Sequence, residues 1–217
     1  MNDETQLFLQ EAFETIYRER HLFSQSFPWR STNNAFWALI AEILLQRTTS
    51  RAALRAYEKF TETYKTPSDL LRDPSKLEGI IGEVGILSRV GQIVKVCEAL
   101  VNEYGSSVPV DKDVLKELPG IGEYISSAVL VNLKGEPYVM IDSNISRTCR
   151  RLTGSEASQR DITHSIECFL KGFQGDPKTK NLALLDFSMV ICRPGRYPKC
   201  YCCTLASECK YKSKFIK

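Results

Sequence analysis

Histidine is scarce in this chain, which has only two among its 217 residues. Neither His21 nor His164 lies in a recognisable motif, so we do not expect chemistry that depends on histidine as the general acid or base. No run of residues is apolar enough over a sufficient length to span a membrane. The amino terminus, MNDETQLFLQEAFETIY, is acidic and amphipathic and is not typical of an export signal. We therefore expect an intracellular protein in a reducing compartment, without a membrane partner.

The alternation of apolar and polar residues that marks a β-strand is also missing, apart from one short run at residues 138–141. Apolar residues instead recur at helical spacing, so we expect an all-α fold. The almost wholly apolar segment 35–46 should be a central buried helix. Other helices are expected at about residues 2–18, 51–64, 67–72, 74–81, 94–104, 143–152, 162–173 and 180–192, with a further helix beginning at about residue 123.

Positive and negative side chains nearly balance, since the formal net charge is only +3. The net charge of the chain therefore does not predict an anionic partner. The distribution is uneven, however, because residues 192–217 contain seven basic residues and one acidic residue. Arg147, Arg150 and Arg151 form a second basic cluster. Such local clusters can bind phosphates, although a lysine-rich terminus can equally be a solvated tail.

Eight cysteines are present, and a reducing compartment favours thiols or metal ligands over disulfides. The spacing C-x7-C-x2-C-x5-C is formed by Cys192, Cys200, Cys203 and Cys209. Four thiolates so close in sequence indicate a metal centre, and either zinc or an iron–sulfur cluster takes such a set. Cys202 is surplus to this pattern. The remaining cysteines lie on helical stretches and should be buried, inert thiols: Cys97, Cys149 and Cys168.

The segment 118–151 reads LPGIGEYISSAVLVNLKGEPYVMIDSNISRTCRR. Its Gly-x-Gly turn, Gly120 to Gly122, should join two helices and leave backbone N–H groups open to a phosphate. The alternative is a simple turn between packed helices. Asp142 follows an apolar run and opens the next helix, where the helix N–H groups can hold an anion. Its alternative role is that of a helix N-cap alone.

Together with FPWR, AEILLQRTT, LDFSMVIC and PKCYCC, these motifs resemble the helix–hairpin–helix DNA glycosylases of the endonuclease III and MutY superfamily, from about residue 27 to residue 209. The resemblance implies two lobes: a six-helix barrel with the hairpin at residues 31–136, and an iron–sulfur cluster lobe formed by residues 1–30 and 137–217. It places Asp142 at the seam between them. The implied cofactor is a structural 4Fe–4S cluster, with zinc as the alternative, although the first cysteine gap is one residue longer than is usual in the family.

The implied activity is base excision repair, in which a flipped-out base is cleaved from its sugar. Asp142 would stabilise the cationic sugar. Family members that also cut the strand carry a lysine where this chain has Tyr124, and a phenol cannot form an imine. We therefore expect a monofunctional hydrolase without lyase activity, acting as a monomer on mismatched double-stranded DNA in the cytoplasm, or at the nucleoid of a prokaryote. Residues expected to contact DNA are Gly120, Gly122, Gln46, Arg47, Arg193, Arg196 and Lys199.

Tyr124 and the ILLQRTT sequence resemble the thymine-DNA mismatch glycosylases of the Mig type, which remove thymine or uracil opposite guanine. Glu42, a lone acid in an apolar helix, is the third candidate catalytic residue and would hydrogen-bond the pyrimidine edge. The first alternative is a MutY-like adenine glycosylase for A·G or A·8-oxoguanine pairs. The sequence stops eight residues after Cys209, without the additional domain of MutY, which argues against that alternative. The second is a non-catalytic DNA-binding module.

Overall fold

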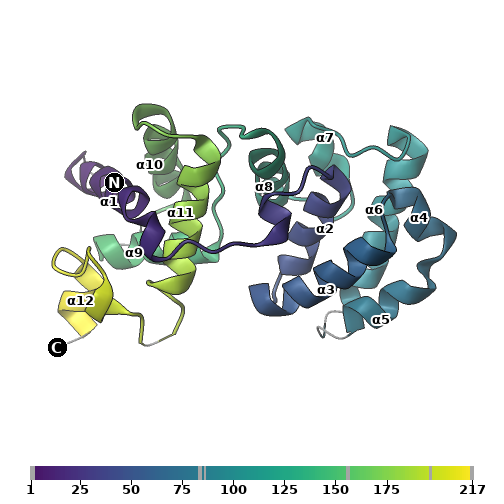
Figure 1. The fold of residues 1–217 in the computed structure, drawn as a ribbon. Helices are drawn as coiled ribbons and strands as arrows, with labels where there is room; N and C mark the ends of the chain where they lie inside the picture. The colour runs from purple at the N-terminus through teal and green to yellow at the C-terminus, as the bar shows by residue number, and fades with distance from the viewer. Residues whose placement is uncertain (1–2, 83–84, 86, 155–156, 196, 216–217) are drawn as a thin grey trace. The chain divides into compact units, whose positions relative to one another are not determined.

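The computed structural model of the protein describes residues 3–82, 85, 87–154, 157–195 and 197–215. Every regular element in these ranges is a helix, so the predicted all-α class is confirmed (Figure 1). None of the described helices combines the length and the apolar character that crossing a membrane requires. The chain divides into two compact units: unit 1 consists of Met1–Gln25 and Gly135–Lys217, and unit 2 consists of Ser26–Lys134.

Unit 1 is built on the packing of its first helix against two later ones. Its helices are α1 (Asp3–Arg18), α9 (Ser143–Thr153), α10 (Gln159–Gly172), α11 (Pro177–Val190) and α12 (Lys210–Phe215). The buried stripe of α1 contains Leu9, Phe13 and Ile16, at the spacing of an amphipathic helix. Phe13 packs against Phe169 of α10, with ring centroids 5.8 Å apart. These contacts bring the amino-terminal helix into the same core as the carboxyl-terminal half.

Two helices of unit 1 begin earlier than predicted, because local capping groups extend them. The capping box of Ser158 and Asp161 starts α10 at Gln159 rather than at residue 162. Asp176 caps α11, whose first residue is Pro177 rather than residue 180. Lys180 on α11 is 1% exposed, and its ammonium group donates hydrogen bonds to the carbonyl oxygens at the end of α10, including that of Leu170 at 2.9 Å. A buried charge is tolerated there because it is hydrogen-bonded to carbonyl oxygens at a helix end, where several lack a partner within the helix.

Unit 2 is organised around α2 (Ala35–Leu45), in which eight residues are buried. The prediction of a central buried helix is confirmed. Around it lie α3 (Ser50–Thr63), α4 (Pro67–Arg72), α5 (Leu77–Gly82), α6 (Ser88–Tyr104), α7 (Lys112–Glu117) and α8 (Glu123–Lys134). The helix α6 begins six residues before the predicted start, because it continues through Gly91. One interior glycine weakens a helix by only about 1 kcal/mol, which tertiary packing can offset.

Residues 210–215 form α12, which packs against α9, so this part of the lysine-rich terminus is helical. One further expectation needs correction. Cys168 was expected to be a buried, inert thiol like Cys97 and Cys149, and it is instead half-buried. Its sulfur lies 3.7 Å from Nε2 of His164, one helical turn away on α10.

Candidate active site and cysteine centre

The hairpin lies in unit 2 between α7 and α8, and its two glycines differ in what they provide. Gly120 has φ +74°, a left-handed conformation that favours glycine, and a Cβ there would lie 2.5 Å from the end of the flexible Gln92 side chain. A Cβ on Gly122 would meet no protein atom within 4 Å. Packing therefore leaves the outer side of Gly122 open, next to the first turn of α8. The N–H groups of such a first turn have no partner within their helix and form an anion site.

Two lysines neutralise the one acidic residue at the start of α8. Glu123 forms an ion pair with Lys112, and a second with Lys116 at 3.6 Å. The hydrogen bond from Lys112 is the main cause of the lowered pKa of the Glu123 carboxyl. Lys116 also forms an ion pair with Asp113 at 2.7 Å, so the two lysines offset nearby carboxylates and leave no excess of positive charge at the hairpin.

Asp142 is the N-cap of α9 in unit 1. Its Oδ1 accepts hydrogen bonds of 2.8 Å from the backbone N–H groups of Asn144 and Ile145. Its Oδ2 accepts a bond of 2.5 Å from the side-chain amide of Asn144. The half-buried carboxylate is held through both oxygens, so its position relative to α9 is fixed. The positive end of the helix dipole favours a negative charge there.

A chain of hydrogen bonds runs from Asp142 toward the cysteines. Arg147 Nη1 donates to Oδ1 of Asn144 at 2.8 Å. Its Nη2 donates to the carbonyl oxygens of Ser188 at 2.7 Å and Cys192 at 3.0 Å. Burial lowers the pKa of the Arg147 guanidinium, and these acceptors offset the loss of water. The end of α11 and the N-cap of α9 are therefore connected through the side chains of Arg147 and Asn144.

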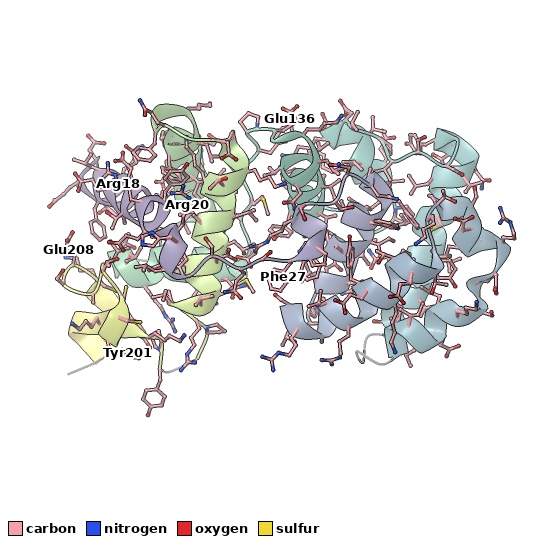
Figure 2. The ribbon with its side chains drawn as sticks, in the orientation of Figure 1. Arg18, Arg20, Phe27, Glu136, Tyr201 and Glu208 are labelled. Atoms are coloured by element: carbon pink, nitrogen blue, oxygen red, sulfur yellow. The ribbon has the colours of Figure 1, made fainter. Side chains whose placement is uncertain are left out.

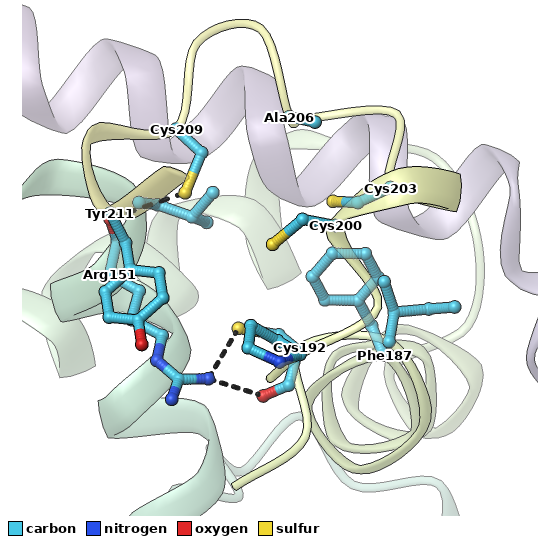
Figure 3. Close-up of a pocket in the computed structure, with 11 residues that line it drawn as sticks. Arg151, Phe187, Cys192, Cys200, Cys203, Ala206, Cys209 and Tyr211 are labelled. Carbon is cyan, nitrogen blue, oxygen red and sulfur yellow. Dashed lines mark hydrogen bonds between the residues drawn. The ribbon is translucent and has the colours of Figure 1, made fainter. Parts of the chain in front are cut away.

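The four predicted ligand cysteines line a single apolar pocket in unit 1 (Figure 3). They come from the end of α11, the 3-10 turn Cys200–Cys202 with the residue after it, and the start of α12. Arg151 of α9 closes one side, donating to the carbonyl oxygens of Arg193 at 2.9 Å and Gly195 at 2.8 Å. One arginine thus holds the loop between the first two cysteines in place.

The chemistry of this pocket suits a group that binds thiolates. Burial, reinforced by the other three thiolates, raises the pKa of Cys203 to about 12. Burial also raises the pKa of Cys200, as do Cys209 and Cys192. A metal ion in the pocket would reverse this effect by stabilising the thiolates.

The spacing of the sulfurs bears on which group would fit. A tetrahedral zinc site with Zn–S bonds of about 2.3 Å needs its sulfurs within about 4 Å of one another. In the parts of the chain that the structure describes, no three histidine, cysteine, aspartate or glutamate side chains converge on a single ion. The four thiols line one pocket, and a set of four cysteines is used both by zinc and by 4Fe–4S clusters. The surplus Cys202 is exposed, and its sulfur donates to the Lys199 carbonyl at 3.5 Å.

Glu42 and Tyr124, the other two predicted catalytic residues, both belong to unit 2. Glu42 is 4% exposed on α2, and its Oε1 accepts a hydrogen bond of 3.4 Å from Nδ2 of Asn132 on α8. This contact gives the buried acid a polar neighbour, as its cost in an apolar helix demands. Tyr124 is half-buried in the first turn of α8.

The predicted DNA contacts outside the hairpin lie at turns. Gln46 is the half-buried C-cap of α2, and the exposed Arg47 after it has φ +58°, a left-handed conformation that is uncommon for a residue with a side chain. Arg193 is exposed, and its Nε donates to the Tyr197 carbonyl at 3.1 Å. Lys199 is half-buried in the same loop, whereas Arg196 lies outside the described residues.

This loop also presents aromatic rings to solvent. Tyr201, which Figure 2 shows pointing away from the ribbon, is 87% exposed. Tyr197 is 72% exposed.

Sequence reasoning overlooked Asn132 and Asn144, which contact Glu42 and Asp142. It noted Arg147 and Arg151 only as members of a basic cluster, and not as partners of Cys192. Asn144 could have been found, because an amide two residues after an N-cap lies within reach of the capping carboxylate. Arg147 lies one helical turn further along the same helix face. The others act across long sequence separations, for which the sequence gives no local signal.

Comparison with known proteins places the chain in a family. Residues 40–169 match the HhH-GPD superfamily, described as base excision DNA repair proteins. The chain is 33% identical to a thymine/uracil-DNA glycosylase of Methanothermobacter thermautotrophicus over 99% of each chain. It is 31% identical to a thymine-DNA glycosylase of Aeropyrum pernix, over 85% of this chain and 86% of that one.

Solved structures agree with this. A thermostable thymine-DNA glycosylase superposes with a TM-score of 0.82 at 31% identity, covering 98% of both chains. An endonuclease III in a non-covalent DNA complex gives a TM-score of 0.79 at 22% identity, over 99% of this chain and 98% of that chain, and shows the shared fold.

Fold and sequence together define a protein of base excision DNA repair. The chain belongs to the HhH-GPD superfamily. The predicted resemblance to the helix–hairpin–helix DNA glycosylases is thereby confirmed, and with it the predicted enzyme class, a DNA glycosylase.

Proposed function

We propose that this chain is a monofunctional mismatch glycosylase, which hydrolyses the N-glycosidic bond of thymine or uracil opposite guanine in double-stranded DNA. The observation that carries the proposal is the full-length similarity to a thymine/uracil-DNA glycosylase, at 33% identity. We further propose that it acts as a monomer. The proposed lobes are the hairpin lobe, residues 31–136, and the cluster lobe, residues 1–30 and 137–217.

Asp142 is the proposed electrostatic catalyst. Cleavage breaks the bond between C1′ and N1 of the base, the electron pair leaves with the base, and the sugar becomes cationic. A carboxylate that is held through both oxygens cannot easily swing away, so its charge is pre-organised for that cation. Water then bonds to C1′ and gives up its proton, leaving an abasic site. The geometry at α9 supports this assignment.

Unit 2 would supply contacts that recognise the DNA backbone and the extruded nucleotide. We propose that the first turn of α8, with Gly120 and Gly122, binds a backbone phosphate, which the open space beside Gly122 supports. Tyr124 would lie against the extruded nucleotide, and Glu42 would hydrogen-bond the pyrimidine edge.

Basic and polar side chains at turns would complete the contact with DNA. We propose that Gln46 and Arg47 fill the gap that the extruded nucleotide leaves in the duplex. We propose that Arg193, Arg196 and Lys199 bind backbone phosphates. The exposure of Arg47 and Arg193 supports this.

We propose that Cys192, Cys200, Cys203 and Cys209 hold a 4Fe–4S cluster with a structural role. The shared pocket supports the ligand set, and the resemblance to the endonuclease III superfamily favours a cluster over zinc. When bound, such a group fixes the loop between α11 and α12 by covalent ligation. The residues of the chain, not the cluster, would perform the hydrolysis.

A labelled-duplex assay tests the function. Duplexes with G·T, G·U, A·G or A·8-oxoguanine pairs are incubated with the protein and then heated in alkali. We expect cleavage only at thymine or uracil, and only after alkali. Cleavage of adenine-containing strands alone would establish the adenine alternative, and cutting without alkali would overturn the monofunctional assignment. Binding without any product would favour a DNA-binding module.

A further inference from the structure

The backbone that leads into Asp142 is held by a side chain distant in sequence. Asn181 of α11 is fully buried, at 0% exposure. Its Oδ1 accepts a hydrogen bond of 3.0 Å from the N–H of Met140. Its Nδ2 donates bonds of 3.0 Å to the carbonyl oxygens of Tyr138 and Pro177. Both hydrogens and the oxygen of one amide are thus used.

This pattern is that of a parallel β-neighbour. In a parallel ladder, one residue accepts from the N–H and donates to the C=O of the two residues that flank its partner. The Asn181 amide makes the same pair of bonds around Val139. No strand is formed in the described residues, although the sequence here is β-like, so one side chain takes the place of a missing strand.

Asp142 consequently lies between two fixed points. On one side, Asn181 holds Met140, two residues before it. On the other side, the carboxylate is bound to the N–H groups of Asn144 and Ile145. Only Ile141 separates Met140 from Asp142, and one residue spans at most about 3.6 Å, so the aspartate has little freedom relative to Met140.

We propose that Asn181 is a positioning residue, which sets where the Asp142 carboxylate stands relative to the sugar. The inference rests on the proposed function, because it assumes that Asp142 is the catalytic carboxylate. Without Asn181, the capping bonds would still form, but α9 and its cap could shift along the connector as one body. The expected defect is therefore in the chemical step and not in DNA binding.

Two substitutions probe this amide. Asn181→Leu removes all three hydrogen bonds and keeps the branched arrangement of side-chain heavy atoms, with methyl groups that are larger than the amide atoms they replace. Asn181→Asp retains the shape and the acceptor for Met140, but at neutral pH it places a carboxylate oxygen against the carbonyls of Tyr138 and Pro177. Burial and these two oxygens would raise the pKa of the new carboxyl, so protonation on acidification restores one donor.

Lys180→Met is the matched control. Lys180 is the adjacent residue on the same helix and is equally buried, but it bonds the end of α10 and not the connector. It should lower stability without changing the chemistry of the folded protein.

The first measurement is the single-turnover rate of excision at saturating protein, under conditions where circular dichroism shows every variant to be folded. We expect a loss of at least tenfold for Asn181→Leu. For Asn181→Asp we expect a similar loss near pH 8, which shrinks relative to wild type as the pH falls toward about 5.5. Lys180→Met should stay within about twofold of wild type. Wild-type rates in both Asn181 variants would overturn the inference, and so would an equal loss in Lys180→Met.

The second measurement reads carboxylate placement without turnover. Duplexes carry either a cationic pyrrolidine in place of the sugar or a neutral tetrahydrofuran at the same site. Wild type should prefer the cation, because it resembles the developing charge. Asn181→Leu should lose at least tenfold of this preference while binding the neutral duplex normally. An unchanged preference would overturn the inference.

Asp142→Asn separates failure of the positioning role of Asn181 from failure of the proposed glycosylase function. If wild type prefers the cation, Asp142→Asn does not, and the Asn181 variants behave as wild type, only the positioning role fails. If wild type neither excises a base nor prefers the cation, the proposed function fails as well.

Discussion

Arg147 donates a hydrogen bond of 3.0 Å from Nη2 to the backbone carbonyl oxygen of Cys192. The same guanidinium donates to Asn144, whose amide is bonded to the Asp142 carboxylate. The N-cap of α9 and the first residue of the cysteine centre are thus three hydrogen bonds apart. A disturbance at either end has a direct physical path to the other, since each bond fixes the orientation of the next side chain.

Arg147→Met should weaken both ends of this path. It removes the Arg147 donor from the carbonyls of Ser188 and Cys192. Cys192 keeps a hydrogen bond of 3.3 Å from Arg151, whereas leaving the Ser188 carbonyl unsatisfied would cost about 1–3 kcal/mol. We expect a lower melting temperature, a slower excision rate and faster loss of the cysteine-bound group. Arg150→Met, at an exposed position of the same helix, is the control and should change little. Equal effects of the two substitutions would show that the path has no special role.

Asp142→Asn should abolish excision and largely spare DNA binding. Asparagine caps a helix about as well as aspartate, so the fold should persist while the negative charge is lost. Asp111→Asn provides the comparison, because Asp111 caps α7 through the N–H groups of Asp113 and Val114. That variant should retain excision. Turnover by Asp142→Asn at the wild-type rate would remove Asp142 from the mechanism.

Tyr124→Lys should confer some strand cutting. A lysine amine at this position could attack C1′ and form an imine, which borohydride reduces to a stable protein–DNA adduct. The adduct would be detected as a band of raised mass on a denaturing gel. Tyr124→Phe serves as the control and should give no adduct. If Tyr124→Lys also gives none, residue 124 does not face the sugar.

Cys203→Ser should remove the cysteine-bound group, whereas Cys202→Ser should retain it. Cys203 lines the pocket, while Cys202 is exposed and bonds only the Lys199 carbonyl among its described contacts. A visible absorbance band in the purified protein would identify iron, and a colourless protein containing zinc would exclude the cluster. Loss of colour in Cys202→Ser with retention in Cys203→Ser would shift the ligand register by one residue.

Arg47→Gly and Arg47→Ala separate backbone strain from side-chain function. Glycine removes the left-handed strain, which is worth about 1 kcal/mol, whereas alanine keeps it. Both lose the guanidinium. We expect Arg47→Gly to be the more stable of the two in thermal unfolding, and both to bind mismatched duplex more weakly than wild type. Unchanged binding by both variants would remove Arg47 from the DNA contact.

Features that depend on neighbouring residues could be predicted from the sequence. The helical class, the buried helix at residues 35–46, the turn at Gly120 and the cap at Asp142 follow from spacing and from groups within one helical turn of each other. The grouping of the four cysteines was also foreseeable, because a short loop keeps them close. Errors in the helix ends arose where a cap or a proline competed with the apolar pattern, as at Ser158 and Pro177.

Tertiary structure alone decided which side chains meet the candidate residues. Asn181 is 41 residues from Met140, Arg147 is 45 from Cys192, and Asn132 is 90 from Glu42. Such pairs form because helices pack by burying their apolar faces, and this packing determines which polar groups come into contact without any mark in the local sequence. The sequence by itself determined the helices, the family and the carboxylate with its local cap, and the packing of α11 against the rest of unit 1 decided what holds the backbone that leads into it.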